Sequence, residues 1–368
     1  MGRLGFESDE PSDITKDRWI QAQRDLITTT LDYNLQTVAD LVTDGRIDLS
    51  PSFQRRDRWD IKRRSLLIES FLMNVPLPPV FLNEDEYGQY SIIDGKQRLT
   101  TISDFLKNDF ALEGLTIFHE ANGLTFRQLD PALRSVLQTR ASIRAIILLR
   151  LSDPLIKYHV FQRLNTGGVR LNAQEVRNVT FAGALNDAIV GAASYPPYRK
   201  LLHITDRNQT KSSLWRQMRD VELILRYLTL QESWQNFSGS LGGAMNTFMF
   251  EHQHASIKER DDLIADFHSA VNKVSSAFGE TAFRRINPST GSMGTQVLAT
   301  LFDAQMTAVR DMAMEDLENN RPKLREGMTR LFSDEMFSKS IGAQTNTPSY
   351  VKTRIHMTQI MVHEAVAH

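Results

Sequence analysis

One short run of the sequence combines the residue types that bind phosphate. A short stretch with two isoleucines, residues 91–93, is followed by an Asp-Gly pair, two cations around an amide, and two hydroxyls. In order, the run is Asp94, Gly95, Lys96, Gln97, Arg98, Leu99, Thr100 and Thr101. A strand that passes through a glycine turn into a helix exposes backbone N–H groups that attract anions. The run therefore indicates a nucleotide or nucleic-acid site.

The side chains of this run have chemical roles that fit phosphate binding. Gly95 lets the backbone turn tightly or approach a ligand closely, and Lys96 and Arg98 can pair with phosphate oxygens. The two threonines lie in the first turns of the expected helix, and Asp94 could hold Mg²⁺, orient a water molecule or cap the turn. The same residues also fit a solvated strand-to-helix turn, because Asp-Gly turns are common and the sequence contains no Walker A loop.

A basic segment precedes the run and offers a second set of phosphate contacts. It holds the cations Arg55, Arg56, Arg58, Lys62, Arg63 and Arg64 around the aromatic Trp59. Clustered cations with an aromatic side chain are typical of nucleic-acid contacts. A solvated helix start, with the long side-chain stems packed on the surface, explains the same pattern. Both interpretations stay open for this segment.

A third segment, residues 161–178, is rich in Asn, Gly and Arg. A helix is expected to end at Asn165, Thr166 and two glycines, and Asn172 with Glu175 predicts the capping box of the next helix. A well-capped connector between two helices is the simpler interpretation. The density of amides and arginines keeps a phosphate or base contact open as the alternative.

The surrounding sequence predicts the elements that position these segments. Apolar periodicity predicts helices at 16–31, 35–42, 60–73 and 97–106, and strands at 47–49, 80–82, 90–93 and 143–149. The two middle strands are expected to form a hairpin, and the chain after about residue 152 is expected to be helical. The expected fold class is α+β, with a mixed α/β N-terminal domain followed by a mainly helical region.

This pattern also suggests how the chain divides into domains. The expected divisions are an N-terminal arm and helix at 1–33, a nucleotide-binding domain at 34–152 and a helical domain at 153–368.

The composition narrows the classes of function. The chain of 368 residues has a net charge of −1, so a nucleic-acid contact would come from a local basic patch. It has no cysteine, which excludes disulfides, thiol catalysis and cysteine-ligated zinc. No apolar run approaches the roughly 18 residues of a membrane span, and the acidic N-terminus does not resemble a signal segment. We therefore expect a cytoplasmic protein without a membrane partner.

Taken together, the three segments resemble the N-terminal domain of GmrS-type proteins, the S half of the GmrSD modification-dependent restriction enzymes. That domain is related to the ParB/sulfiredoxin fold. Its pattern is met, in order, at residues 53–59, 76–78, 94–101 and 161–178. The resemblance covers about residues 34–185 strongly and extends more weakly through 220–226. One departure is Lys96, which stands where the family has Gln, so nucleotide preference or hydrolysis could differ.

The resemblance implies a ParB-like core that binds a nucleoside triphosphate, which some members hydrolyse and couple to DNA cleavage in antiphage defence. Carried over by position, it implies catalytic roles for Asp94, Gln97 and Arg98, with Asp94 as a ligand of Mg²⁺. It implies nucleotide-binding roles for Gln54, Arg55, Lys96, Arg98, Asn165, Thr166 and Arg177, and the chemistry of the run adds Gly95, Thr100 and Thr101 to this set. The implied cofactors are a nucleoside triphosphate and Mg²⁺. The expected partners are DNA, a nuclease encoded elsewhere and a second copy of the chain.

Full-length members of this family usually append an HNH-type nuclease domain, which needs a histidine base and metal ligands. The close histidine pair in this chain, His252 and His254 after Glu251, is better explained as polar helix or loop residues. The function expected from the sequence is therefore nucleoside triphosphate binding and hydrolysis by a sensor or regulator of DNA cleavage.

Two other functions stay open. The basic stretch at 55–64 suggests a non-enzymatic module that binds DNA, modified or not, or a protein partner. A metal-dependent DNA endonuclease would instead use Asp94 together with Glu84, Asp85 or Glu86 from the preceding loop. A solvated hairpin tip is the simpler explanation of those loop acids.

Overall fold

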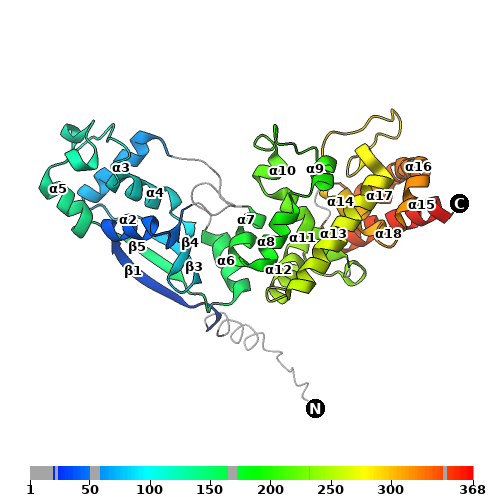
Figure 1. Ribbon diagram of the computed structural model, residues 1–368, viewed down its shortest axis with the longest axis horizontal. Helices are drawn as coiled ribbons and strands as arrows, with labels where there is room; N and C mark the ends of the chain where they lie inside the picture. Colours follow the sequence, from blue (N-terminus) through cyan, green and yellow to red (C-terminus); the bar gives the residue numbers. More distant parts are fainter. Residues whose placement is uncertain are drawn as a thin grey trace, which may run out of the picture. The chain divides into compact units, whose positions relative to one another are not determined.

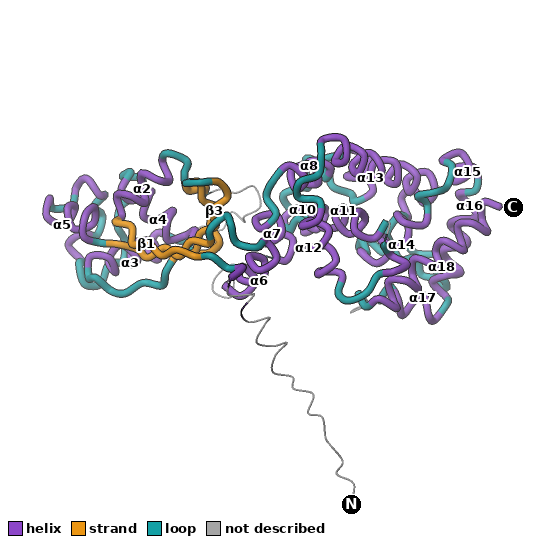
Figure 2. Tube along the Cα trace, turned by 90° about the horizontal axis from the view of Figure 1, so that it is seen from below, coloured by secondary structure: helices purple, strands orange, loops and turns teal. Residues whose placement is uncertain are grey.

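The structure is a computed structural model, and it describes residues 20, 24–49, 59–164, 172–231, 233–342 and 346–367. The chain divides into two compact units, an N-terminal unit of residues 1–171 and a C-terminal unit of residues 172–368 (Figure 1). The strands, orange in Figure 2, lie in the N-terminal unit, so the expected α+β class is confirmed. Every helix within the described ranges is too short or too polar to cross a membrane.

A mixed five-stranded sheet forms the centre of the N-terminal unit, with the strand order β1-β5-β3-β4-β2. The strands are β1 Thr28–Asn34, β2 Ile47–Asp48, β3 Val80–Glu86, β4 Gln89–Asp94 and β5 Ser142–Leu148. β3 and β4 form the expected antiparallel hairpin. β5 pairs antiparallel with β1 and parallel with β3. This internal position explains the nearly unbroken apolar sequence of β5.

Helices of this unit share a hydrophobic core with one face of the sheet. The helices of the unit are α2 Leu35–Thr43, α3 Ile61–Leu72, α4 Lys96–Leu106, α5 Pro131–Ser135 and α6 Pro154–Leu164. Alternate residues of β5, namely Ile143, Ala145 and Ile147, join the core formed with α2, α3 and α4, as the two-residue period of a strand requires. The side chains of Asn34 and Asp60 accept hydrogen bonds from the first turns of α2 and α3 and so fix where these helices begin.

The helix expected at residues 16–31 is wrong at its C-terminal end, because residues 28–31 belong to β1. Three consecutive threonines favour a strand, since β-branched side chains fit a pleated surface better than a helix. Residues 16–19 and 21–23 lie outside the described residues. The other strands and helices expected in this unit are confirmed. The expected domain boundaries at 33/34 and 152/153 stay predictions.

The C-terminal unit is built from helices, as expected. They are α7 Ala173–Thr180, α8 Ala184–Ala192, α9 Pro196–Leu201, α10 Ser213–Arg216, α11 Arg219–Leu230, α12 Leu241–Glu251, α13 Ile257–Phe278, α14 Ala299–Ala308, α15 Met314–Asn319, α16 Arg321–Ser333, α17 Glu335–Ser340 and α18 Pro348–Ala367. The predicted capping box at the start of α7 is confirmed, because Asn172 and Glu175 each accept the other's backbone N–H.

A buried ion cluster of Arg226, Asp303 and Arg354 joins α11, α14 and α18. Asp303 accepts hydrogen bonds from Arg226 Nε at 2.9 Å, from Arg226 Nη2 at 2.5 Å and from Arg354 Nη2 at 2.7 Å. The three side chains are at most 5% exposed. Burial alone would lower the pKa of Arg226, but the charges of Asp303 and Glu222 outweigh burial and raise it. The cluster therefore ties three helices together through one buried carboxylate that is shared by two guanidinium groups.

Asp220 is a buried carboxylic acid in the first turn of α11. It is 3% exposed, and its Oδ1 accepts the N–H of Val221 at 3.0 Å. Burial raises the pKa of Asp220 to about 7, and the N–H of Val221 and the charge of Arg199 oppose this shift only in part. The folded protein therefore disfavours the ionised form of Asp220 at neutral pH.

We expect Asp220→Asn to stabilise the protein increasingly as the pH rises. Because the pKa of Asp220 is higher in the folded protein, its favourable contribution is complete below about pH 4 and is lost as the pH rises through 7. The variant should gain about 2–3 kcal/mol over wild type between pH 5 and pH 8, as measured by urea denaturation. Asp316→Asn, at an exposed site in the first turn of α15, is the matched control. Equal pH responses of the two variants would contradict this expectation.

Candidate functional site

The chain turns from β4 into α4 at Gly95. The φ angle of Gly95 is +101°, in the left-handed region that favours glycine. A Cβ atom at this position would lie 2.4 Å from Cγ1 of Val80 on the neighbouring strand β3. Glycine is therefore required here for backbone conformation and for space. Because Gly95 has no side chain, it gives α4 no side-chain cap, and a helix N-terminus of this kind favours an anion.

The side chain of Arg98 connects this turn to the proline-rich segment before β3. Its Nη2 donates to Asp94 Oδ2 at 2.8 Å, and its Nη1 donates to the carbonyl oxygen of Pro78 at 2.6 Å. The Arg98 side chain is 12% exposed, whereas that of Asp94 is 32% exposed. Arg98 is thus engaged with the carboxylate and with the proline-rich turn. The role of Pro78 was missed from the sequence, because a backbone acceptor leaves no signal in the residue type.

Gln97 connects the same turn to the basic segment. Its Oε1 accepts the backbone N–H of Trp59 at 3.0 Å. The guanidinium of Arg63 lies over the ring of Trp59, 4.6 Å from the centroid. Trp59 is therefore fixed beside the first turn of α4. The predicted nucleotide contacts Gln54 and Arg55 lie outside the described residues.

The remaining residues of the run differ in accessibility. Lys96 and Thr100 are partly exposed. Thr101, by contrast, is 1% exposed and lies inside the domain. The nucleotide-binding roles of these three residues stay predictions.

Arg177 is the predicted pocket residue that lies in the C-terminal unit. It is 2% exposed, and its Nε donates to Asn246 Oδ1 at 2.8 Å while its Nη1 donates to Gln174 Oε1 at 3.2 Å. These amides give Arg177 a structural role within the helices around α7. The predicted contacts Asn165 and Thr166 lie outside the described residues, so the closure of a pocket by this segment stays a prediction.

The acids of the β3–β4 hairpin are held by contacts within the N-terminal unit. Asp85 accepts two side-chain hydrogen bonds there, and burial raises its pKa. Glu84 accepts the N–H of Arg150 at 3.1 Å, and Glu86 pairs with the Arg150 guanidinium at 2.8 Å. Across the described residues, no group of three or more His, Cys, Asp or Glu side chains is placed to hold a metal ion. The endonuclease alternative, in which Asp94 shares a metal with these acids, gains no support from this arrangement.

The cations that follow Trp59 face other groups of the protein. Arg64 donates to Asp104 at 2.6 Å, and its guanidinium lies 4.0 Å from the ring centroid of Phe110. Lys62 Nζ lies 3.9 Å from a carboxylate oxygen of Glu113. These contacts link α3 to α4 and to the loop that follows α4. For Arg64, whose side chain is 12% exposed, the structural interpretation is therefore favoured, whereas both interpretations stay open for the exposed Lys62.

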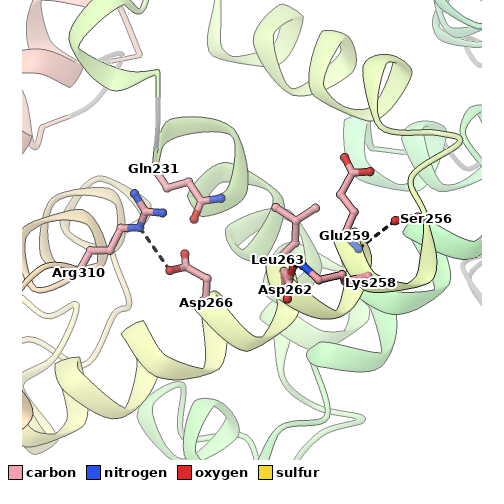
Figure 3. A pocket seen from close by; sticks show the side chains of 8 residues that line it. All are labelled: Gln231, Ser256, Lys258, Glu259, Asp262, Leu263, Asp266 and Arg310. Atoms are coloured by element: carbon pink, nitrogen blue, oxygen red, sulfur yellow. Dashed lines mark hydrogen bonds and ion pairs between the residues drawn. The ribbon is translucent and has the colours of Figure 1, made fainter.

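A separate cavity of about 340 Å³ opens beside α13 in the C-terminal unit (Figure 3). Its lining consists of Gln231, Ser256, Lys258, Glu259, Asp262, Leu263, Asp266 and Arg310. Charged residues of this lining pair with one another, Lys258 with Asp262 at 2.8 Å and Arg310 with Asp266 at 3.3 Å. None of the residues predicted from the sequence lines this cavity, and its mutually paired charges favour no particular class of ligand.

The protein therefore belongs to a class in which an α+β unit carries the sequence Asp-Gly-Lys-Gln-Arg where a strand, here β4, turns into a helix, here α4. Residues 38–182 match the family described as the GmrSD restriction endonuclease, N-terminal domain. The match contains the whole 94–101 run, and it confirms the resemblance to the GmrS-type N-terminal family over this segment. No curated protein and no solved structure matches the chain. The relation to ParB and sulfiredoxin stays a prediction.

Proposed function

We propose that this protein acts in a restriction or antiphage defence system, as a sensor or regulator of DNA cleavage that binds and hydrolyses a nucleoside triphosphate. The match of residues 38–182 to the GmrSD N-terminal domain supports the defence role. The observation that carries the nucleotide site is the Gly95 turn, whose left-handed backbone and close approach to Val80 start α4 directly after β4. A phosphate is favoured at such a helix N-terminus.

The residues of the turn supply complementary chemistry in this proposal. Lys96 adds a flexible point charge for phosphate oxygens, and Asp94 is the carboxylate that would hold Mg²⁺. Mg²⁺, when bound, neutralises charge on the phosphate oxygens. Arg98 orients Asp94 through their 2.8 Å hydrogen bond and adds positive charge where negative charge develops during hydrolysis. Gln97 keeps Trp59, and with it the end of the basic segment, beside the bound phosphates.

We expect the wild-type protein to bind a nucleoside triphosphate in the presence of Mg²⁺, and Lys96→Ala to weaken that binding about 10- to 100-fold. A charge-assisted hydrogen bond contributes about 1.5–3 kcal/mol, which corresponds to this range. Lys107→Ala is the matched control, because Lys107 is an exposed cation at the opposite end of α4. Calorimetric titration with each common nucleoside triphosphate measures binding, and phosphate release by wild type and Arg98→Ala measures hydrolysis.

Two outcomes would redirect this proposal. If wild type binds no nucleoside triphosphate, the nucleotide function fails. If Lys96→Ala and Lys107→Ala weaken binding equally, the phosphates do not lie at the start of α4. The non-enzymatic alternative is tested in parallel by gel shift on modified and unmodified duplex DNA at two salt concentrations, since phosphate-dominated binding weakens steeply with salt.

A further inference from the structure

The two edges of the five-stranded sheet differ greatly in length. At one edge, β2 pairs with β4 through only two residues, Ile47 and Asp48. At the other edge, β1 pairs with β5 in unbroken register from Thr28 to Asn34. The outer side of β1 has no strand neighbour within the described part of the chain. The β2 edge therefore has two residues for pairing with another strand, and the β1 edge has seven.

β1 lacks the features by which proteins protect an exposed edge. Bulges, prolines, lysines and very short strands prevent an edge from pairing with another chain. The sequence of β1 is Thr-Thr-Thr-Leu-Asp-Tyr-Asn, and its register with β5 contains no bulge. Its one charged residue, Asp32, is paired at 2.9 Å with Arg144 of β5. Leu31, at the midpoint of the strand, is 41% exposed.

We propose that β1 pairs antiparallel with β1 of a second copy of this chain, with a two-fold axis at Leu31. The two sheets then form one continuous sheet across the axis. Leu31 faces the partner's Leu31, and Thr30 faces the partner's Asp32. This inference concerns an interaction surface and is independent of the proposed nucleotide function.

The strand's own sequence argues for a second copy as the occupant. In this register Leu faces Leu, Thr29 faces the partner's Tyr33 and Thr30 faces the partner's Asp32, and such apolar, aromatic and hydrogen-bonding pairs stabilise a sheet. Moving the axis by one residue, to Asp32, would instead place two carboxylates directly opposite each other. Closed two-fold pairing also uses the same surface on both copies and leaves only the two-residue β2 edges at the ends of the joined sheet.

The size of this interface sets the strength that we expect. A pair of seven-residue strands buries less surface than a stable interface of standard size. The dimer should therefore be in equilibrium with the monomer and should depend on protein concentration. A covalent trap is the sharpest way to detect such a dimer and to fix its register.

The absence of cysteine from the chain makes a register test direct. In Leu31→Cys the two thiols would lie across the axis, with Cα atoms about 4.5–5.5 Å apart, within the range of a disulfide. Mild oxidation should convert most of this variant to a covalent dimer on a non-reducing gel. In the matched control Thr28→Cys, the thiols would lie about 20 Å apart, so no covalent dimer should form. A monomeric Leu31→Cys with a reactive thiol, or equal cross-linking of both variants, would overturn the proposal.

A charge substitution tests the dimer without cross-linking. Leu31→Lys places two like charges opposite each other and should raise the dimer dissociation constant at least about tenfold, as measured by sedimentation equilibrium. Leu66→Lys places the same charge at a leucine of similar exposure, 42%, on α3 and should leave the dimer unchanged. Far-UV circular dichroism checks that both variants keep the wild-type fold. A wild type that stays monomeric at its highest soluble concentration, or equal weakening by both variants, would contradict the proposed surface.

Discussion

Asp303→Asn is expected to destabilise the C-terminal unit by about 3–5 kcal/mol, because it leaves two buried guanidinium groups without their counter-charge. Asp303 is fully buried and bonds to Arg226 and to Arg354 at 2.5–2.9 Å. An amide in its place supplies one acceptor oxygen and turns an NH₂ group toward a cation. Thermal denaturation should show a fall in midpoint of about 10 °C for a unit of this size.

The same unit offers a control for this expectation. The Arg330–Glu326 pair lies within one turn of α16, and its side chains are 68% and 71% exposed. Glu326→Gln should cost no more than about 0.5 kcal/mol, because water solvates the remaining charge. If Asp303→Asn proves as mild as Glu326→Gln, the three-helix cluster does not hold the unit together.

Gly95→Ala is expected to destabilise the N-terminal unit and to abolish the nucleotide binding that we propose for the β4–α4 turn. An L-residue at φ +101° costs about 1–2 kcal/mol in backbone strain. The new Cβ, 2.4 Å from Val80 Cγ1, adds about 1–3 kcal/mol of overpacking. Because the turn must move to relieve the contact, Asp94 and Arg98 lose their arrangement. Urea denaturation and nucleotide titration measure the two effects.

Gly88→Ala measures the cost of backbone strain without the steric overlap that Gly95→Ala also introduces. Gly88, in the β3–β4 hairpin, also has a positive φ, +76°, but a Cβ there meets nothing within 4 Å. It should therefore cost only the backbone term and leave the turn at Gly95 intact. In a double-mutant cycle, Val80→Ala should recover part of the loss in Gly95→Ala. Additive effects of the two substitutions would show that Cγ1 of Val80 does not limit this position, since Val80→Ala keeps the Val80 Cβ at 2.8 Å from the new atom.

The parts of the fold that were predicted correctly are those in which local sequence decides the structure. The strand at 143–149 and the helix at 60–73 follow from apolar spacing alone, because each buries its own pattern against a single core. The helix expected at 16–31 failed where Thr28 begins β1, since that strand exists through pairing with β5, more than a hundred residues later. Pairing between such distant segments leaves little trace in either one.

For the candidate site, too, local sequence predicted the residues but not their long-range contacts. The order of residue types identified the 94–101 run, and the family match contains it. Arg98 donates to the Pro78 carbonyl oxygen, and Gln97 accepts the N–H of Trp59. Both contacts join chain segments that meet only after folding, so they could not be predicted from the sequence. Thr101 is a polar residue, yet it is buried, because α2 and α3 pack against α4. Residue types can therefore nominate a site, but only packing decides which side chains a ligand can reach.

β1 also bears on how this protein can be divided. Residues 28–34 precede the segment that matches the GmrSD N-terminal domain, yet they cover one side of β5. A fragment restricted to residues 38–182 would expose an edge of β5, whose buried residues include Ile143, Ala145 and Ile147. Long apolar edges of this kind drive aggregation. We therefore expect a soluble fragment of the N-terminal unit to begin at or before Thr28, and a fragment cut at the bounds of the family match to aggregate.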